Sequence, residues 1–149
     1  PEGLEKVIHH VKDATEKGAS IATGGKAIKG NFFEPTVLLD VPYDSIIAEE
    51  ETFGPICALF RFKTENEVIK LANDTPFGLA SYFYSDNVTR CFRVAEQLEA
   101  GMVGINAGLI SNAAAPFGGV KESGLGREGS KYGLDEYIEV KYMCFGYQI

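Results

Sequence analysis

The sequence predicts an α/β fold, and three observations support that prediction. Between Ile56 and Ile105, short apolar runs alternate with helical patterns, which is typical of parallel β-α-β crossovers. An amphipathic helical pattern precedes this region. The chain has 149 residues, of which 45% are hydrophobic, so it has the size and the apolar content of one domain. We therefore expect a mostly parallel sheet with flanking helices.

The first half of the chain predicts one helix and three strands. Apolar residues in 4–16 follow an i, i+3, i+4, i+7 stripe that ends at Gly18, and His9 and His10 are expected mostly on the polar side of this helix. Short apolar runs then predict strands, with Pro35 marking an edge or an irregularity in the second one. The predicted strands span residues 19–23, 32–41 and 56–62.

The second half continues the alternation of helices and strands. A capping box at residues 64–67 opens a helix to about Asn73. Asp86 or Ser85 is expected to cap a second helix, which Gly101 ends as its C′ residue. The remaining elements are strands at 79–84, 102–105 and 137–145, with a glycine-rich loop and a helix around 130–136 before the last strand.

Composition argues against two classes of function. The 14 Lys and Arg against 21 Asp and Glu give a net charge of -7, and no basic stripe compensates locally, so we expect no nucleic-acid binding. The longest uncharged run, residues 100–120, is too rich in glycine and polar residues to cross a membrane. We therefore expect no membrane partner.

Three widely spaced cysteines, Cys57, Cys91 and Cys144, fit neither a disulfide framework nor a zinc site, which favours a reducing, cytoplasmic setting and no metal. None has the cationic or helix-N-terminal context of a nucleophilic thiolate, so packing roles are favoured for the cysteines and for both histidines. The chain begins with Pro1 and has neither an initiator Met nor a signal peptide, so we expect a piece of a longer protein.

Residues 124–129 satisfy the pattern G-x-G-x-x-G. A dinucleotide-binding loop must directly follow a strand, so that the pyrophosphate lies on the next helix N-terminus. Residues 121–123 do not read as a strand, so a conformational turn is favoured over a phosphate loop. An independent nucleotide-binding module built on these glycines remains the alternative.

The acidic run at residues 49–51 precedes an aromatic residue and a rigid Gly-Pro pair. Such runs are usually solvated. Here, however, Glu51 and Phe53 would present a hydrogen-bond acceptor beside a flat apolar face, which suits a ribose hydroxyl and an adjacent planar ring. Both interpretations are open on these residues alone.

Three stretches together resemble motifs of the aldehyde dehydrogenase superfamily. Residues 50–55 match its E-E-x-F-G-P motif, and residues 31–36 match its [FY]-x-x-P-T strand entry. Asn106 with residues 116–128 matches its N…PFGG-x-K-x-SG-x-GRE signature. Within the superfamily, the sequence is most similar to succinate-semialdehyde dehydrogenases, and enzymes acting on glutarate semialdehyde share much of this similarity. The stretches that carry it are residues 108–111, 129–133 and 139–144.

The resemblance implies an NAD- or NADP-dependent oxidation in which a cysteine thiolate attacks the aldehyde and a glutamate-activated water hydrolyses the thioester. The G-Q-x-C and E-x-G-G contexts of that cysteine and glutamate are absent, so no catalytic residue is assigned and the isolated chain is expected to be inactive. Residues 1–134 resemble the C-terminal part of the catalytic domain. Residues 135–149 resemble the strand and tail through which the family forms dimers and tetramers.

Four site residues carry over from the family motifs. Glu51 matches the acid that accepts hydrogen bonds from the nicotinamide ribose, and Phe53 the aromatic residue beside the nicotinamide. Ser111 matches a hydroxyl that binds the distal carboxylate of the substrate, and Phe117 a residue lining the aldehyde tunnel. Another aldehyde dehydrogenase, or a non-catalytic interaction module for the isolated chain, is the alternative function.

Overall fold

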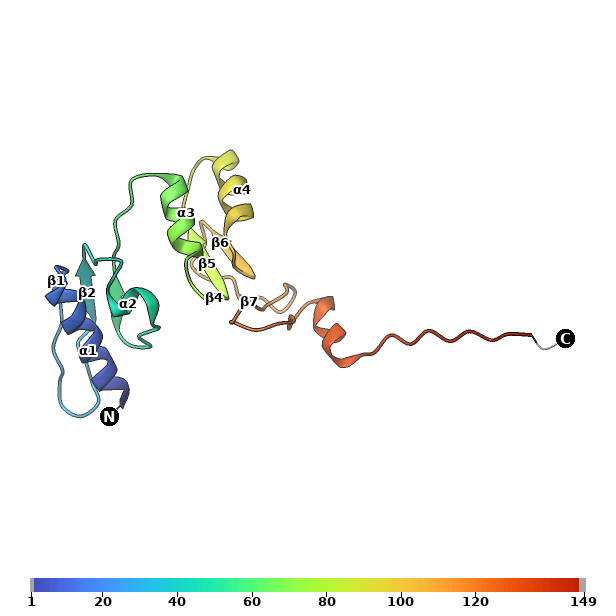
Figure 1. The fold of residues 1–149 in the computed structure, drawn as a ribbon, viewed down its shortest axis with the longest axis horizontal. Coiled ribbons are helices and arrows are strands. Elements are labelled where there is room, and N and C mark those ends of the chain that lie inside the picture. Colours follow the sequence, from blue (N-terminus) through green and yellow to red (C-terminus); the bar gives the residue numbers. More distant parts are fainter. Residues whose placement is uncertain (1, 148–149) are drawn as a thin grey trace. The chain divides into compact units, whose positions relative to one another are not determined.

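The computed structural model describes residues 2–147 and has the α/β fold that the sequence predicts (Figure 1). Contacts divide the chain into two compact units, with the boundary between Thr64 and Glu65. Among the described strands, β1–β2 and β4–β7 are antiparallel, whereas β2–β3 and β5–β6 are parallel, so the sheets are mixed rather than mostly parallel.

The N-terminal unit packs α1 (Glu2–Glu16) against a sheet with the strand order β1-β2-β3. The strands are β1 (Ser20–Thr23), β2 (Thr36–Leu39) and β3 (Ile56–Ala58), so the second and third are shorter than predicted. Gly18 has a φ of 117°, a backbone conformation that glycine tolerates best, as expected after the helix end. The buried hydrophobic cluster of this unit consists of Val7, Val11, Ala14, Ala19, Phe33, Leu38 and Val41.

His10 lies in this core rather than on the polar side of α1. Its side chain is 1% exposed, because position 10 falls between Val7 and Ala14 on the face of the helix that packs inward. The sequence prediction for His10 was therefore wrong about the face. His9, its neighbour, is exposed.

A short helix that the sequence did not predict, α2 (Ile46–Glu49), lies between β2 and β3. Its first backbone N–H, that of Ile46, donates to Asp13 Oδ2 of α1 at 2.8 Å. Lys17 Nζ lies 3.0 Å from the other Asp13 oxygen. These contacts, led by the backbone hydrogen bond, lower the pKa of Asp13. A side chain from a different helix thus caps α2.

The C-terminal unit contains the predicted crossover: β5 (Ala80–Phe83) and β6 (Met102–Ile105) are parallel, and α4 (Val88–Gln97) connects them. Helix α3 (Glu65–Asn73) begins directly after Thr64, as predicted, but connects strands of two different sheets. The remaining strands, β4 (Phe77–Gly78) and β7 (Val120–Lys121), form an antiparallel pair.

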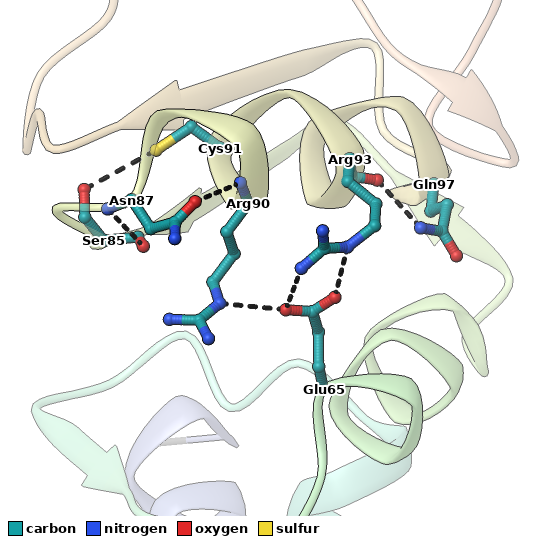
Figure 2. A network of polar contacts seen from close by, with 7 residues as sticks. All are labelled: Glu65, Ser85, Asn87, Arg90, Cys91, Arg93 and Gln97. Atoms are coloured by element: carbon teal, nitrogen blue, oxygen red, sulfur yellow. Dashed lines mark hydrogen bonds and ion pairs between the residues drawn. The ribbon is translucent and has the colours of Figure 1, made fainter.

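The cap of α4 is Asn87, not Asp86 or Ser85 as predicted. Asn87 Oδ1 accepts a hydrogen bond from Arg90 N at 2.9 Å, while the Ser85 hydroxyl accepts from Asn87 N at 3.2 Å (Figure 2). The helix ends at Gln97, so Gly101 is not its C′ residue. Glycine is needed there for a different reason, because a Cβ at position 101 would collide with the carbonyl of Gly118.

Glu65 joins α3 to α4 through two arginines, both of which point toward it (Figure 2). Arg93 donates from Nε to Oε1 at 2.7 Å and from Nη2 to Oε2 at 3.0 Å, and Arg90 Nε donates to Oε2 at 3.0 Å. These bonds, led by that of Arg93, lower the pKa of Glu65. The two helices are thereby fixed to each other on their exposed side.

The last described element is a 3₁₀ helix, η1 (Lys131–Tyr137), where the sequence predicts a helix. Residues 138–147 follow it as extended chain without a β-ladder to any described residue (Figure 1). Val140 is 96% exposed. The predicted strand at 137–145 therefore has no partner among residues 2–147, and its role in oligomerisation stays a prediction. Within those residues, no helix combines the length and the apolar character needed to span a membrane.

Candidate functional site

The turn at residues 50–55 presents Glu51 and Phe53 from the N-terminal unit. The Glu51 side chain is exposed and makes no hydrogen bond or ion pair with any residue that the structure describes. Phe53 is 90% exposed, and its backbone has a φ of 48°, which is rare for a bulky residue. The structure thus brings together a free carboxylate and a bare aromatic ring two residues apart.

Helix α1 holds the N-terminal side of this turn. His10 Nδ1 lies 2.9 Å from the Thr52 hydroxyl oxygen, in a hydrogen bond that links residues 42 positions apart. Glu50 Oε2 lies 3.3 Å from Lys6 Nζ and 3.7 Å from His10 Nε2. Burial, and after it the positive charge of Lys6, lower the pKa of His10 below 6.5. Burial and Lys6 thus favour the neutral imidazole, whereas Glu50 favours the charged one.

The sheet and α1 hold the C-terminal side of the turn. Thr36 N of β2 donates to the carbonyl of Pro55 at 2.9 Å. Gly54 packs so closely on Val7 that a Cβ there would collide with the valine. Phe53 borders a cavity of about 420 Å³, whose wall also includes Leu4, Val7, Phe32, Phe33 and Pro55.

Phe117 lines a separate cavity in the C-terminal unit. Its backbone exchanges two hydrogen bonds with Glu128, each of 2.8 Å, which fixes the chain on both sides of the cavity. Arg127 Nη1 donates to the carbonyls of Gly119 and Gly126 at 2.7 Å each. The cavity has a volume of about 340 Å³, and its wall also includes Leu79, Ser123, Leu125, Glu136 and Tyr137.

Ser111 lies in the exposed loop that follows β6. Asn106 begins this loop with a φ of 54°, and its side-chain amide pairs with the backbone of Ser85 through bonds of 2.8 and 2.7 Å. Within the described residues, the Ser111 hydroxyl has no hydrogen-bond partner and is not part of the wall of the Phe117 cavity. The two predicted substrate residues are therefore in one unit but not in one cavity.

The glycine motif and the cysteines, which the sequence also offers as candidates, lie in surroundings that fit a structural role. Gly124, Gly126 and Gly129 all have positive φ, and the next helix begins only at Lys131, which supports the turn interpretation of this motif. The three cysteines are free thiols. Cys91 Sγ lies 3.5 Å from the carbonyl of Ser85 (Figure 2).

Sequence reasoning missed the residues that hold the Glu51–Phe53 turn. The sequence pattern places His10 on the wrong face of α1 and assigns no role to Thr52. One signal was available: position 10 is three residues after Val7 and four before Ala14, which is the spacing of one helix face.

Comparison with known proteins shows the family. The sequence model of the aldehyde dehydrogenase family matches residues 1–143. The chain belongs to the aldehyde dehydrogenase family, as its three motif stretches predicted.

The similarity to individual relatives covers nearly the whole length of this chain. A glutarate-semialdehyde dehydrogenase of Pseudomonas putida is 64% identical over 95% of the chain and 29% of the relative. An NADP(+) succinate-semialdehyde dehydrogenase of Escherichia coli is 61% identical over 96% of the chain and 30% of the relative. The crystal structure of a succinate-semialdehyde dehydrogenase from Burkholderia pseudomallei has a TM-score of 0.94 and 60% identity, over 97% of the chain and 30% of that structure. The chain thus spans less than a third of the length of these relatives.

Proposed function

We propose that the chain is the C-terminal part of an NAD- or NADP-dependent dehydrogenase that oxidises succinate semialdehyde to succinate. The observation that carries the proposal is the turn at residues 50–55, where an unpartnered carboxylate lies beside an exposed ring. Family membership and the names of the relatives support it. Glutarate semialdehyde is the second candidate substrate, because the relative from Pseudomonas putida is named for it.

The residues of the turn fit the nicotinamide end of a dinucleotide. A ribose carries hydroxyl donors and needs acceptors, and the Glu51 carboxylate is an acceptor without a partner among the described residues. Phe53 offers a bare aromatic face to a planar ring. The bound dinucleotide supplies the hydride acceptor. Glu51 orients the ribose, and Phe53 limits the positions open to the ring.

Two residues of the C-terminal unit are assigned to the substrate. Ser111, whose hydroxyl is exposed, binds the distal carboxylate of the semialdehyde by a hydrogen bond. Phe117 forms part of the apolar wall past which the aldehyde enters, in keeping with its place at the edge of a cavity of about 340 Å³.

The nucleophilic cysteine and the general base are proposed to lie outside the chain. None of Cys57, Cys91 and Cys144 has a sequence context that fits the nucleophile, so the isolated chain should form no NADH or NADPH with succinate semialdehyde. Residues 1–134 are assigned to the catalytic domain and residues 135–149 to an oligomerisation strand and tail. Free thiols, one of them on the exposed Cys57, support a cytoplasmic setting.

The Glu51 assignment is tested in the full-length enzyme. Glu51→Gln keeps the shape but removes the charge that the ribose hydroxyls contact, so the cofactor ring is misplaced and pre-steady-state hydride transfer slows by about 10-fold or more. Aldehyde binding is unchanged. Glu49→Gln, two residues away in the same acidic run, is the matched control and leaves the rate as in the wild type. An unchanged hydride-transfer rate in Glu51→Gln would refute the role.

The substrate assignment is tested by comparing charged and uncharged aldehydes. Ser111→Ala removes a hydrogen bond to a carboxylate, a loss of about 1.5–3 kcal/mol, so KM for succinate semialdehyde rises by about 10-fold or more. KM for butanal, which has no carboxylate, is unchanged. Equal effects on both aldehydes would make Ser111 a structural loop residue. The ratio of kcat/KM for succinate and glutarate semialdehyde decides between the two substrates.

A further inference from the structure

We propose that His10 is a positioning residue for the cofactor: through the Thr52 hydroxyl, it holds the turn that presents Glu51 and Phe53. This inference rests on the proposed function of those two residues. His10 itself is buried in α1 and touches neither the ribose nor the reacting atoms in this assignment.

The contact joins a rigid element to a loop. His10 lies on a 15-residue helix whose inner face forms the core of the unit, and its Nδ1 lies 2.9 Å from Thr52 Oγ1. Thr52 stands between Glu51 and Phe53, so fixing its side chain restrains both neighbours. Within the described chain, the hydroxyl of Thr52 has this one hydrogen bond. Glu50 also contacts α1 on that side, with its Oε2 3.3 Å from Lys6 Nζ and 3.7 Å from His10 Nε2, but the Thr52 contact is the one made between Glu51 and Phe53.

The backbone of Phe53 explains why such a restraint is needed. A φ of 48° is unfavourable for an aromatic residue and persists only where the surrounding structure enforces it. The Pro55 carbonyl, bound by Thr36 N at 2.9 Å, fixes the chain after Phe53. The His10–Thr52 bond fixes it before Phe53. Because the ring is 90% exposed, its own packing within the described residues contributes little.

The surroundings of His10 favour its neutral form overall, because burial and Lys6 lower its pKa while Glu50 acts in the opposite direction. Lys6 and His9 of α1 and Glu50 of the turn act on it, with Lys6 and Glu50 paired at 3.3 Å. A neutral imidazole has one donor and one acceptor nitrogen, and a hydroxyl can serve as either partner, so the bond to Thr52 forms with either tautomer. Burial of the ring excludes water from competing for Nδ1.

The first test removes the hydroxyl without touching the core. Thr52→Val in the full-length enzyme deletes the bond at almost constant volume and should slow hydride transfer by about 10- to 100-fold, with KM for succinate semialdehyde unchanged. Thr52→Ser retains the hydroxyl and should restore most of the rate. Thr15→Val is the matched control, because among the residues that the structure describes the Thr15 hydroxyl bonds within α1 alone, to the carbonyls of Val11 and Lys12 at 2.9 Å each.

The second test changes the other partner of this hydrogen bond, His10. His10→Asn places an amide near the position of Nδ1 and should keep the contact to Thr52, whereas His10→Gln reaches toward the position of Nε2 and should lose it. We expect hydride transfer to be faster in His10→Asn than in His10→Gln. The reverse order, or a Thr52→Val enzyme as fast as wild type, would overturn the proposal.

A measurement that does not depend on enzymatic turnover tests this inference separately from the proposed function. Fluorophenylalanine at position 53 gives a ¹⁹F resonance in the cofactor-free protein, which should broaden or shift in Thr52→Val and stay as in wild type in Thr52→Ser and Thr15→Val. If the wild-type enzyme oxidises no semialdehyde but this resonance responds as expected, the proposed function fails and the positioning of the turn stands. A resonance insensitive to Thr52→Val overturns the inference in either case.

Discussion

At the scale of single residues, burial decides what a polar side chain can do. His10 and His9 are adjacent in the sequence, yet only His10 is enclosed by the core of the N-terminal unit. Enclosure removes water from the imidazole and penalises its charged form, and Lys6 adds to that penalty. The same burial that makes His10 a rigid anchor for Thr52 therefore makes the unit sensitive to acid.

This burial predicts a pH dependence of stability with a definite sign. The pKa of His10 is lowered below its ordinary value of 6.5, so on acidification the unfolded chain takes up the proton first. The free energy of unfolding should be unaffected by His10 above pH 6.5 and fall below it, by at most about 1.4 kcal/mol per pH unit, until the folded-state pKa is reached.

Denaturant unfolding of the chain between neutral and mildly acidic pH measures this dependence. His10→Asn cannot titrate in this range, so the difference between its pH profile and that of the wild type isolates the contribution of His10. A wild-type profile that runs parallel to the His10→Asn profile, or a difference of the opposite sign, would contradict the prediction.

The residue scale also shows what sequence patterns can and cannot give. The sequence indicates Glu51 and Phe53 as candidates, because an acceptor and an aromatic ring beside a Gly-Pro pair are unusual in an acidic run. The positive φ of Phe53 could not be predicted, because the neighbouring residues of the turn contact Thr36 and His10, which lie far away in the sequence. Local patterns identify the candidate residues, but not the contacts that position them.

At the scale of elements, local sequence patterns predicted where most helices and strands lie, whereas tertiary contacts determine where several of them end. Helix α3 begins after Thr64, and β6 has its predicted bounds, because capping and apolar runs are local signals. The strands predicted at 32–41 and 56–62 are shorter, since only the part of each run that finds a neighbour forms a ladder. Helix α2 went unpredicted, because its cap, Asp13, comes from another helix.

Helix α4 gives a direct test of a cap that the sequence left ambiguous. Asn87→Ala deletes the side-chain oxygen that accepts from Arg90 N at 2.9 Å, so the chain should lose about 0.5–2 kcal/mol of unfolding free energy. Thermal or denaturant unfolding measures the loss. Asp86→Ala, one residue earlier, is the matched control and should change stability by less than about 0.5 kcal/mol. If Asp86→Ala were the more damaging change, the cap assignment would be wrong.

At the scale of the whole chain, the proposed site residues are distributed over two compact units. Glu51 and Phe53 belong to the N-terminal unit, and Ser111 and Phe117 to the C-terminal unit. The family motifs proposed both groups, because a motif can be recognised in the sequence alone. The division at Thr64 was not predicted, since the boundary carries no linker-like composition. The chain also spans less than a third of its relatives, so the assembled site is a property of a longer protein in this proposal.

The C-terminal segment is the part of the chain whose apolar residues most need a partner. Ile138, Val140 and Tyr142 alternate with charged residues, which is the period of a half-buried strand, yet all three are exposed. Ile138 has φ of −126° and ψ of 152°, already the backbone of a strand. An extended segment with an unpaired edge and one apolar face is a template for another chain.

We therefore predict that the chain associates with a second copy through this segment. In sedimentation experiments the intact chain should be dimeric or larger, and a version cut after Asp135 should be monomeric. Val140→Glu places a charge on the apolar face and should weaken association as the truncation does. Glu139→Gln, one residue earlier on the opposite face, should leave association intact. The contrary result is that the intact chain, the truncated chain and the two variants all sediment at the same rate. In that case the segment takes no part in self-association, because neither its presence nor its apolar face influences the assembly.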